Sequence, residues 1–500
     1  MPKPHYEYKY IAEGSLLYTW SDNTIMGFSH THYSGVGMNS GGDILFQPTV
    51  GNKLQIVPGP ADNPDEGYRS RFSHDEETAS PGYYSVMLRD YNVKVELTSA
   101  RRVAFHLYTF PENADANIII DLGHQIGTAP APGDHLVPVI VDGYLKGHTG
   151  FDAGFVYDAM RIKALEKPKP PVPLSSGRSG LEYYLKSGYT PVDKVTESVS
   201  NTLELAYDDW CIAQMARALG KDDDYTLFME RAKNYSNVWD RDTEFMRPRK
   251  SDGSFLEMAE GKEQEIVEKD GHRYYRYFDP LLVGVRPNRH YTESNAWQYI
   301  WSVQHDVAGL ISLFGSSDRF NKKLDSFFEM DPAISGPKYI GVVGTIGQYV
   351  HGNQPSHHVA YLYNYSGEPW KTQYWTRQIC EQLYRPGPAG LCGNEDMGSL
   401  SSWYVLSAMG FYPVTPGNPV YSIGSPLFGK TIIRPARGVE FIIEAENNSP
   451  VNKYIQSATL NGEPLDKPQI SHGDIMKGGR LSFVMGPEPR FDPGQGNKPD

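Results

Sequence analysis

The period of the hydrophobic pattern changes twice along this 500-residue chain, and this change constrains the fold more than any single motif. Before residue 124, short apolar or alternating segments are separated by Gly, Pro and Asp, as in an antiparallel sandwich. From Val137 to Met409 apolar residues recur mainly at helical spacing, and after Pro413 they alternate again. The sequence therefore predicts a β domain, a helical domain and a smaller β domain, in that order.

The boundaries of these changes give four expected regions. Residues 1–124 form an N-terminal β-sandwich domain, and residues 125–197 form a linker with the first helices. Residues 198–412 form the catalytic domain, where loops with unusual residues join amphipathic helices, as in a toroid of helix pairs. Residues 413–500 form a C-terminal β cap, in which Asn461 and the glycine after it indicate a tight hairpin turn.

The composition argues against several classes of protein. The net charge of −13, from 47 Lys and Arg against 60 Asp and Glu, disfavours nucleic acid and anionic membranes as partners. We expect no membrane span, because no apolar run reaches about 18 residues, and no signal peptide is visible at the N-terminus. Cys211, Cys380 and Cys392 lack metal-binding spacing and allow at most one intrachain disulfide, so the redox compartment stays open.

Three clusters of polar and aromatic residues lie within residues 291–411. They are YTESNAWQY at 291–299, HGNQPSHH at 351–358 and GNEDMG at 393–398. Such residues collect where a chain builds a polar pocket, because a buried polar group costs free energy unless it has a partner. Glu293, Glu395 and Asp396 are the candidate carboxylates for acid–base chemistry.

Each acid also has a purely structural explanation. Glu293 can interact favourably with the dipole of a helix that starts beside it. Alternatively, it can act as a catalyst over an aromatic wall that raises its pKa. Glu395 and Asp396 precede a helix, so one of them can be a helix cap or first-turn acid. Two adjacent acids beside Asn394 also suggest a catalytic role, because one acid could hold water or sugar while the other orients it.

The loop at 351–358 combines amides with imidazoles. The side-chain oxygens of Asn353 and Gln354 suit a hard cation such as calcium. Three histidines could instead indicate zinc, but no acid stands at the spacing of a zinc enzyme. Structural hydrogen bonding is an equally acceptable explanation of the histidines.

Taken together, several stretches resemble glycoside hydrolase family 92, the calcium-dependent exo-α-mannosidases. Besides the three clusters, they are GFSHTH at 27–32 with GD at 42–43, PGYYSV at 81–86, YDDWCIA at 207–213, FMRPR at 245–249, SSWYV at 401–405 and GFYP at 410–413. The resemblance covers most of the chain. It implies an N-terminal β-sandwich, a linker helix region, an (α/α)6 barrel and a C-terminal β cap.

The resemblance implies an inverting hydrolysis of terminal α-mannosides on glycans or glycoproteins. Glu293 matches the general acid and Asp396 the base that activates water, with Asn394 and Glu395 in the same loop. Inversion needs about 6.5–9.5 Å between the two carboxyl groups. With Asn394, the candidate substrate-binding residues are His351 and Trp297.

The resemblance also implies calcium, bound to the 2- and 3-hydroxyls of mannose. Asn353 and position 354 match its protein ligands. The family usually has Glu where this chain has Gln354, so the expected site loses a negative charge and binds calcium more weakly.

A second departure from the family concerns length. From the resemblance, we expect the chain to lack the Gly-rich start of the sandwich and a long piece between about His124 and Asp134, and to be shortened at residues 150–185. We therefore expect an incomplete toroid with an open site and reduced or absent activity, in a monomer or homo-oligomer. The alternative hypothesis is a catalytically impaired, carbohydrate-binding remnant of an enzyme of this family. A third hypothesis is a toroidal glycosidase that acts on another sugar. Family members are often secreted or periplasmic, and the compartment of this chain stays open.

Overall fold

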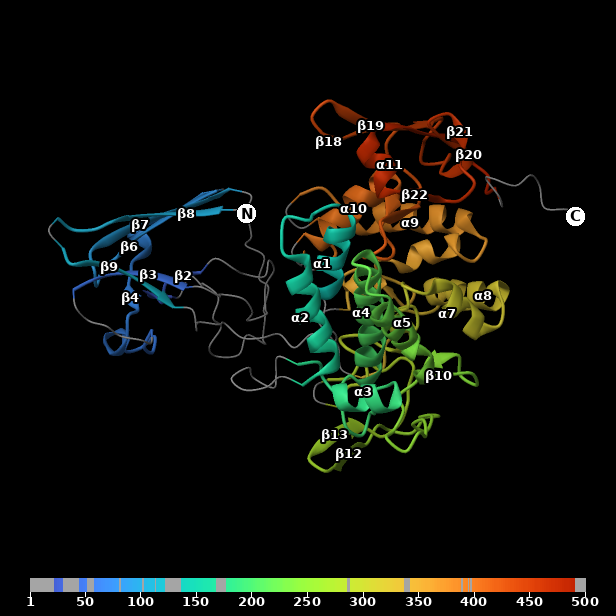
Figure 1. Cartoon of the computed structure of the whole chain (residues 1–500), viewed down its shortest axis with the longest axis horizontal. Coiled ribbons are helices and arrows are strands. Elements are labelled where there is room, and N and C mark those ends of the chain that lie inside the picture. Colours follow the sequence, from blue (N-terminus) through green and yellow to red (C-terminus); the bar gives the residue numbers. More distant parts are fainter. Residues whose placement is uncertain are drawn as a thin grey trace, which may run out of the picture. The chain divides into compact units, whose positions relative to one another are not determined.

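The computed structural model describes residues 22–29, 45–51, 58–80, 82–100, 103–112, 114–121, 136–167, 177–285, 288–336, 342–387, 390–393, 395 and 398–490. The chain divides into two compact units, Met1–Pro130 and Ala131–Asp500 (Figure 1). His30 and His32 of the GFSHTH stretch lie outside the described residues. The finer boundaries at residues 197 and 412 stay a prediction.

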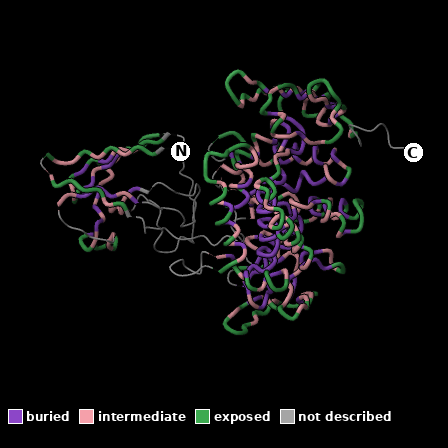
Figure 2. Tube along the Cα trace, viewed as in Figure 1, coloured by how far each residue is buried: buried purple, intermediate pink, exposed green. Residues whose placement is uncertain are grey.

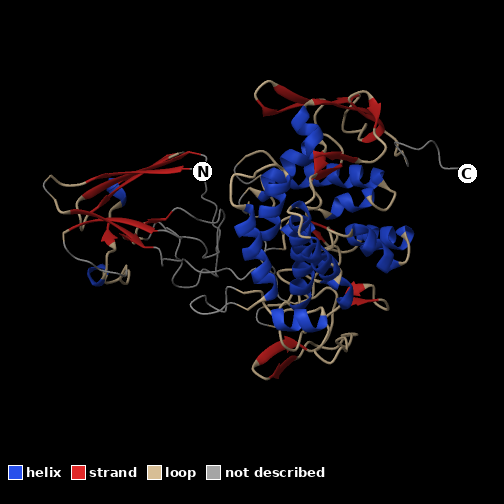
Figure 3. Ribbon diagram, in the orientation of Figure 1, coloured by secondary structure: helices blue, strands red, loops and turns tan. Residues whose placement is uncertain are grey.

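The first unit contains two antiparallel sheets, β2-β3-β9 and β5-β6-β7-β8, and β1 pairs with β4 (Figure 3). The strands are β1 (Thr24–Ile25), β2 (Phe28–Ser29), β3 (Leu45–Val50), β4 (Ser70–Arg71), β5 (Glu77–Ser80), β6 (Tyr83–Leu88), β7 (Val93–Ala100), β8 (Val103–Thr109) and β9 (Ala116–Asp121). Val86 lies opposite Val95, and both are buried in the core between the sheets. Across this core, Phe46 of β3 lies edge-on to His106 of β8, with 5.5 Å between ring centroids. The alternating pattern correctly predicted a β domain here.

The second unit is mainly helical as far as Met409. Its helices to that point are α1 (Leu136–Leu145), α2 (Ala153–Leu165), α3 (Leu181–Ser187), α4 (Ser198–Ala218), α5 (Asp222–Arg231), α6 (Ala296–Tyr299), α7 (Val307–Phe314), α8 (Ser317–Glu329), α9 (Pro369–Leu383) and α10 (Ser399–Met409). Helix α4 is buried around its whole circumference and forms the centre of the unit (Figure 2). Among the described helices, none has both the length and the apolar character needed to cross a bilayer.

Short strand pairs lie between these helices. They are β10 (Trp239–Asp240) with β11 (Phe245–Met246), β12 (Ile266–Lys269) with β13 (His272–Tyr275), and β14 (Thr345–Ile346) with β15 (Tyr349–Val350). The apolar residues at 299–303 and 359–365 predict two helices, and both predictions were wrong: α6 ends at Tyr299, and Val359–Asn364 is a 3-10 helix. Residues 359–363 are all completely buried, so no solvent-facing stripe marks a helical period there.

The chain after Phe411 returns to strands, as predicted. One sheet has the order β16-β17-β22, and a second has the order β18-β19-β23-β20-β21. The elements are β16 (Phe411–Tyr412), β17 (Val420–Ile423), β18 (Lys430–Ala436), β19 (Val439–Glu446), β20 (Tyr454–Leu460), β21 (Glu463–Pro464), β22 (Gln469–Ser471), α11 (His472–Lys477) and β23 (Gly479–Gly486). Asn461 and Gly462 both have positive φ, at 54° and 91°, as the predicted tight turn requires.

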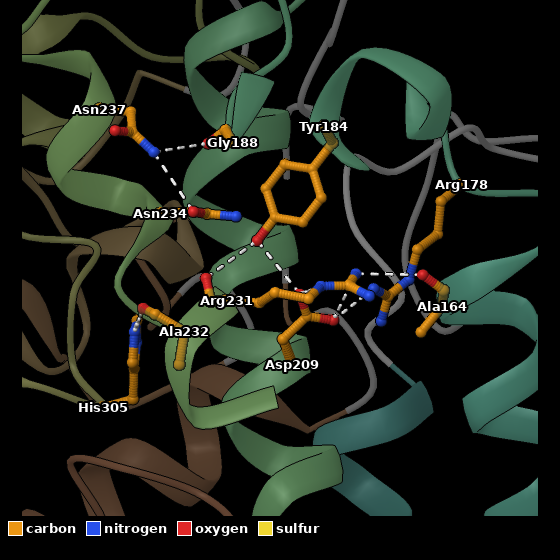
Figure 4. Close-up of polar contacts among 10 residues, drawn as sticks. All are labelled: Ala164, Arg178, Tyr184, Gly188, Asp209, Arg231, Ala232, Asn234, Asn237 and His305. Carbon is orange, nitrogen blue, oxygen red and sulfur yellow. Dashed lines mark hydrogen bonds and ion pairs between the residues drawn. The ribbon is translucent and has the colours of Figure 1, made fainter. Parts of the chain in front are cut away.

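A buried ionic cluster around Asp209 joins the helices of the second unit (Figure 4). The Asp209 carboxylate on α4 accepts from Arg178 at 2.6 Å and from Arg231 Nε of α5 at 2.8 Å. Tyr184 of α3 donates to the same carboxylate at 3.2 Å, and Arg231 also donates to the Ala164 carbonyl of α2 at 3.0 Å. The side chains of Arg178 and Asp209 are fully buried, so this cluster as a whole ties α2, α3, α4 and α5 together away from water.

Candidate active site

The first two polar clusters are joined by side-chain hydrogen bonds. Asn353 donates from Nδ2 to the Ser294 hydroxyl at 3.1 Å and to the Glu293 carbonyl at 3.4 Å. Asn353 and Ser294 are both buried, so these bonds are shielded from water. Glu293 is therefore held next to the amide-rich loop at 351–358, as expected if the polar clusters shape one pocket.

The start of α6 strengthens the same junction. Asn295 and Gln298 form a reciprocal capping box, and the Asn295 side chain donates to Gln348 Oε1 at 2.9 Å. Gln348 in turn donates to the carbonyls of Asp331 and Ala333 at 2.9 and 2.8 Å. These residues were not predicted, although the spacing Asn295-Ala-Trp-Gln298 is readable as a capping box.

Glu293 has an unusual backbone conformation. Its φ is 57°, in the left-handed region that side chains with a β-carbon rarely adopt. The preceding residue fixes this turn, because the Thr292 N–H donates to the Ser200 hydroxyl of α4 at 2.8 Å. Strained backbone of this kind clusters at functional sites, where surrounding contacts maintain it. The Glu293 side chain is partly exposed, as a proton donor to a substrate must be.

The third cluster packs directly against the second. A β-carbon built on Gly393 would lie only 2.8 Å from the Cα of Gly352. Only glycine allows the two backbones to approach so closely. Gly393, the first residue of the third cluster, is therefore a direct neighbour of the second cluster.

His351 holds the second cluster from inside the protein. Its Nδ1 lies 2.6 Å from the Tyr349 hydroxyl, and its Nε2 lies 2.6 Å from the Tyr384 hydroxyl. Tyr384 donates its proton to the Leu400 carbonyl at 2.8 Å, so His351 Nε2 must be the donor to Tyr384. The ring is thus the neutral Nε2–H tautomer, and burial holds its pKa well below the usual value.

The burial of His351 corrects one prediction. The residue is completely buried and both ring nitrogens are engaged, so it has no nitrogen for direct contact with a sugar. It instead links the amide-rich loop to α10 through Tyr384. Nothing in the local sequence indicates Tyr384, which lies on another part of the chain.

The other two histidines of this loop are also structural. His357 donates to the His351 carbonyl at 2.9 Å, and His358 donates to the Trp301 carbonyl at 2.8 Å. Burial lowers the pKa of both to about 4, so both are neutral at ordinary pH. The explanation by hydrogen bonding is therefore the correct one, and zinc is not favoured.

Glu395 has the structural role that was weighed for it. Its carboxylate accepts from the Ser401 N–H at 3.2 Å and from the Ser401 hydroxyl at 2.9 Å, in the first turn of α10. Negative charge is favourable at this end of a helix. Asp396 and Asn394 lie outside the described residues, so the separation of the two catalytic carboxylates stays a prediction.

Trp297 lies in α6, four residues after Glu293, and is partly buried. Its ring meets Phe245 edge-on at 5.1 Å between centroids, and Lys323 Nζ of α8 lies over it at 4.2 Å. Its predicted contact with a sugar stays a prediction. Lys323 was missed in the sequence, because a lysine on an amphipathic helix resembles any solvated charge.

The expected calcium ligands can be tested by their donor atoms. The nitrogen of the Asn353 side chain is used in two hydrogen bonds, which leaves Oδ1 as the oxygen that could meet a cation. Gln354 follows it and is only partly buried. Within the described part of the chain, no group of three or more acids, histidines or cysteines could hold a metal. The two amide oxygens are of the kind that a hard cation binds, but neither of them carries a negative charge.

Profile comparisons match nearly the whole chain to one family. The catalytic domain of glycosyl hydrolase family 92 matches residues 120–487, and the N-terminal domain of that family matches residues 10–161. A relative from Arthroderma benhamiae, described as an uncharacterized secreted glycosidase, is 29% identical over 380 residues. The alignment covers 71% of this chain and 45% of the relative, so the chain spans less than half of that protein.

Solved structures of related fold come from Bacteroides thetaiotaomicron. A family GH92 alpha-mannosidase is 27% identical, with a TM-score of 0.67 over 95% of this chain and 90% of the other. The same enzyme in complex with mannoimidazole matches at the same TM-score of 0.67. An inverting GH92 mannosidase, 23% identical, shares the fold at a TM-score of 0.64 over 96% of this chain and 92% of the other.

Proposed function

Because this chain belongs to glycosyl hydrolase family 92, we propose that it is an inverting exo-α-mannosidase acting on terminal α-mannosides of glycans or glycoproteins. The observation that carries the proposal is the meeting of the Glu293 turn, the Asn353 loop and the Gly393 loop. The binding of mannoimidazole by a relative of 27% identity supports mannose as the sugar.

In the proposed reaction, Glu293 gives its proton to the glycosidic oxygen as the bond from that oxygen to the anomeric carbon breaks. Asp396 takes a proton from a water molecule, whose oxygen attacks the anomeric carbon from the opposite face. The products are the shortened glycan with a free hydroxyl and mannose of inverted anomeric configuration. Glu395 keeps the loop that carries Asp396 docked on α10, and Asn394 and Trp297 contact the sugar.

The cofactor proposed from the family is calcium, and Asn353 Oδ1 and Gln354 would hold it. When bound, calcium fixes and polarises vicinal sugar hydroxyls through its charge. With two neutral amides in place of an amide and a carboxylate, this chain contributes less charge to the site. We therefore expect weak calcium binding and slow turnover, in a toroid that is incomplete.

The test is mannose release from a chromogenic α-mannoside by the whole chain, with and without calcium. Glu293→Gln and Asp396→Asn should each lower kcat by at least about 100-fold, the scale of general acid–base catalysis. The matched controls are Glu230→Gln and Asp223→Asn, which remove charge at exposed positions of α5. Unchanged turnover in either site variant rejects the assignment, and retention of configuration in the first-formed sugar rejects inversion.

A second candidate is a carbohydrate-binding remnant without catalysis. It is favoured by the neutral Gln354 and by apolar side chains left uncovered on α1 and α2, where Val139 is 67% exposed and Phe155 is 72% exposed. In a complete ring of helices such residues would be covered. Calorimetry with mannose beside the chromogenic assay separates the candidates, because binding without turnover supports the remnant.

A further inference from the structure

The amine of Lys323 lies between two aromatic rings beside the Glu293 turn. Its Nζ is 3.7 Å from the centroid of the Phe245 ring and 4.2 Å from the centroid of the Trp297 ring. Both distances lie well within the range of a cation–π interaction. The two rings also meet edge-on at 5.1 Å, so the amine and the two rings form one compact group. We call these three side chains the lysine clamp.

Charged groups do not explain the position of this amine. Among the residues that the structure describes, none forms a hydrogen bond or ion pair with Lys323 Nζ. The charged group that faces it is Glu244, before β11, and Glu244 is already paired with Arg319 on α8. Burial lowers the pKa of Lys323 to about 8, which the attraction of Glu244 only partly offsets. The aromatic faces are therefore the main partners of this charge.

Ordinary packing of a lysine stem does not produce this arrangement. A packed lysine lays its methylene groups on apolar surface and sends its amine to water. Here the amine itself lies over both rings, on the side of α8 that faces the short helix α6.

The clamp acts on the helix that begins just after the candidate acid. Trp297 belongs to α6, whose start is fixed by the Asn295 capping box two residues after Glu293. The cap fixes the backbone at one point, and the clamp fixes the side chain of the next turn. We propose that Lys323 is a positioning residue, which holds Trp297 and the Glu293 turn in place for the sugar through its contact with two aromatic faces. This role rests on the proposed mannosidase function, but the clamp itself does not.

The charge of the clamp gives it a recognisable signature. A neutral amine has no cation–π attraction to either ring, so Trp297 is released as pH rises through the pKa of Lys323. The signal of Trp297 should therefore change in a single step near pH 8. Arginine stays charged throughout, whereas methionine keeps the length of the stem without charge.

The experiment is a pH titration of the tryptophan near-ultraviolet circular dichroism of the full chain, from about pH 6.5 to about pH 9.5, below the usual tyrosine range. The Trp297→Phe variant identifies the share of the signal that belongs to Trp297. The wild-type step should be absent in Lys323→Met and absent within this range in Lys323→Arg. No step in the wild type, or the same step in Lys323→Met, overturns the clamp. This titration needs no turnover, so its result is independent of the proposed function.

The positioning role of Lys323 is tested by measuring the affinity for mannose by calorimetry and, where turnover is measured, by KM. At about neutral pH, Lys323→Met should weaken mannose binding about three- to tenfold, the range of a partly desolvated cation–π contact, while Lys323→Arg should retain most of it. In the wild type the same loss should develop as pH rises through the step. Equal affinity in wild type and Lys323→Met overturns the positioning role, even if the clamp titrates as expected.

Discussion

Glu293 illustrates how a single residue can be held in a costly conformation. The left-handed region costs a residue with a β-carbon about 1 kcal/mol, and its φ of 57° lies there. The neighbours on both sides are fixed, Thr292 by the Ser200 hydroxyl and Ser294 by the Asn353 amide. Their hydrogen bonds offset the cost and aim the carboxylate independently of a regular helix.

Gln354, which stands where the resemblance implies Glu, gives a prediction about calcium binding. Gln354→Glu should strengthen calcium binding about tenfold, because ligand charge sets much of the affinity of a calcium site. Calorimetric titration with calcium chloride measures the change. Gln382→Glu is the control, since it adds the same charge at an exposed position of α9. Equal gains in both variants would mean that overall charge, and not a local site, attracts the ion.

Asp209 is a residue on which the stability of the helical unit should depend strongly, because it is the shared acceptor of a buried ionic cluster. Asp209→Asn leaves the buried guanidinium groups of Arg178 and Arg231 with a neutral partner, which should lower the free energy of unfolding by about 3–5 kcal/mol. Urea unfolding followed by helix circular dichroism measures this loss.

The matched control is Asp270→Asn at an exposed pair. Lys194 lies 2.9 Å from Asp270, whose side chain is 67% exposed, so this change should cost less than about 1 kcal/mol. A similar loss in both variants would show that the cluster around Asp209 is no stronger than a surface ion pair.

At the scale of elements, the histidine loop should make the helical unit sensitive to acid. The folded pKa of His357 and His358 is lowered by burial to about 4, below the usual value of 6.5, so both stay neutral when folded. Unfolding exposes them, and the unfolded chain then binds protons below about pH 6.5. Stability is therefore full above this pH and is lost as pH falls toward 4, by about 1.4 kcal/mol per pH unit for each histidine.

The variant His357→Gln tests this dependence. It removes one of the protons that unfolding takes up, so the slope of unfolding free energy against pH should fall by about 1.4 kcal/mol per unit between about pH 6 and about pH 4.5. Urea unfolding at a series of pH values gives the slope. The exposed His148 provides the control, and His148→Gln should leave the slope unchanged. An unchanged slope in His357→Gln would contradict the buried, neutral state.

Elements with a clear period were predictable from the sequence, and contacts between elements were not. Helix α8 (Ser317–Glu329) is readable from the sequence, because its apolar residues recur on one face while charges fill the other. The fully buried residues 359–363 have no such contrast, and their 3-10 helix was missed. The approach of Gly393 to Gly352 and the tyrosines around His351 depend on distant segments, which local periodicity does not record.

The candidate site was predictable only in part for the same reason. Residue types indicated which loops carry chemistry, and the hydrogen bonds of Asn353 bring two of those loops together as expected. Burial and hydrogen bonding decided what residue types left open: His351 is inside the protein, and Glu395 accepts hydrogen bonds from Ser401 in the first turn of α10. Lys323 and its two aromatic partners come from three separate elements, so no spacing rule could have found them.

At the scale of the whole molecule, the two compact units should unfold separately. Met1–Pro130 has its own core of strand residues, and Ala131–Asp500 has a separate core of helix and strand residues. Units with separate cores break the two-state behaviour of a single domain. Differential scanning calorimetry of the full chain should therefore show two transitions, the larger with the greater heat because unfolding enthalpy scales with size.

Acid identifies which transition belongs to which unit. Four histidines of the second unit, among them His290 and His305, have a pKa that burial lowers to about 4. Lowering the pH from about 7 to about 5 should therefore reduce the Tm of the larger transition more than that of the smaller one, by protonation of histidines exposed on unfolding. His357→Gln should reduce this shift, whereas His148→Gln should not. A single transition at both pH values would mean that the two units stabilise each other and unfold as one body.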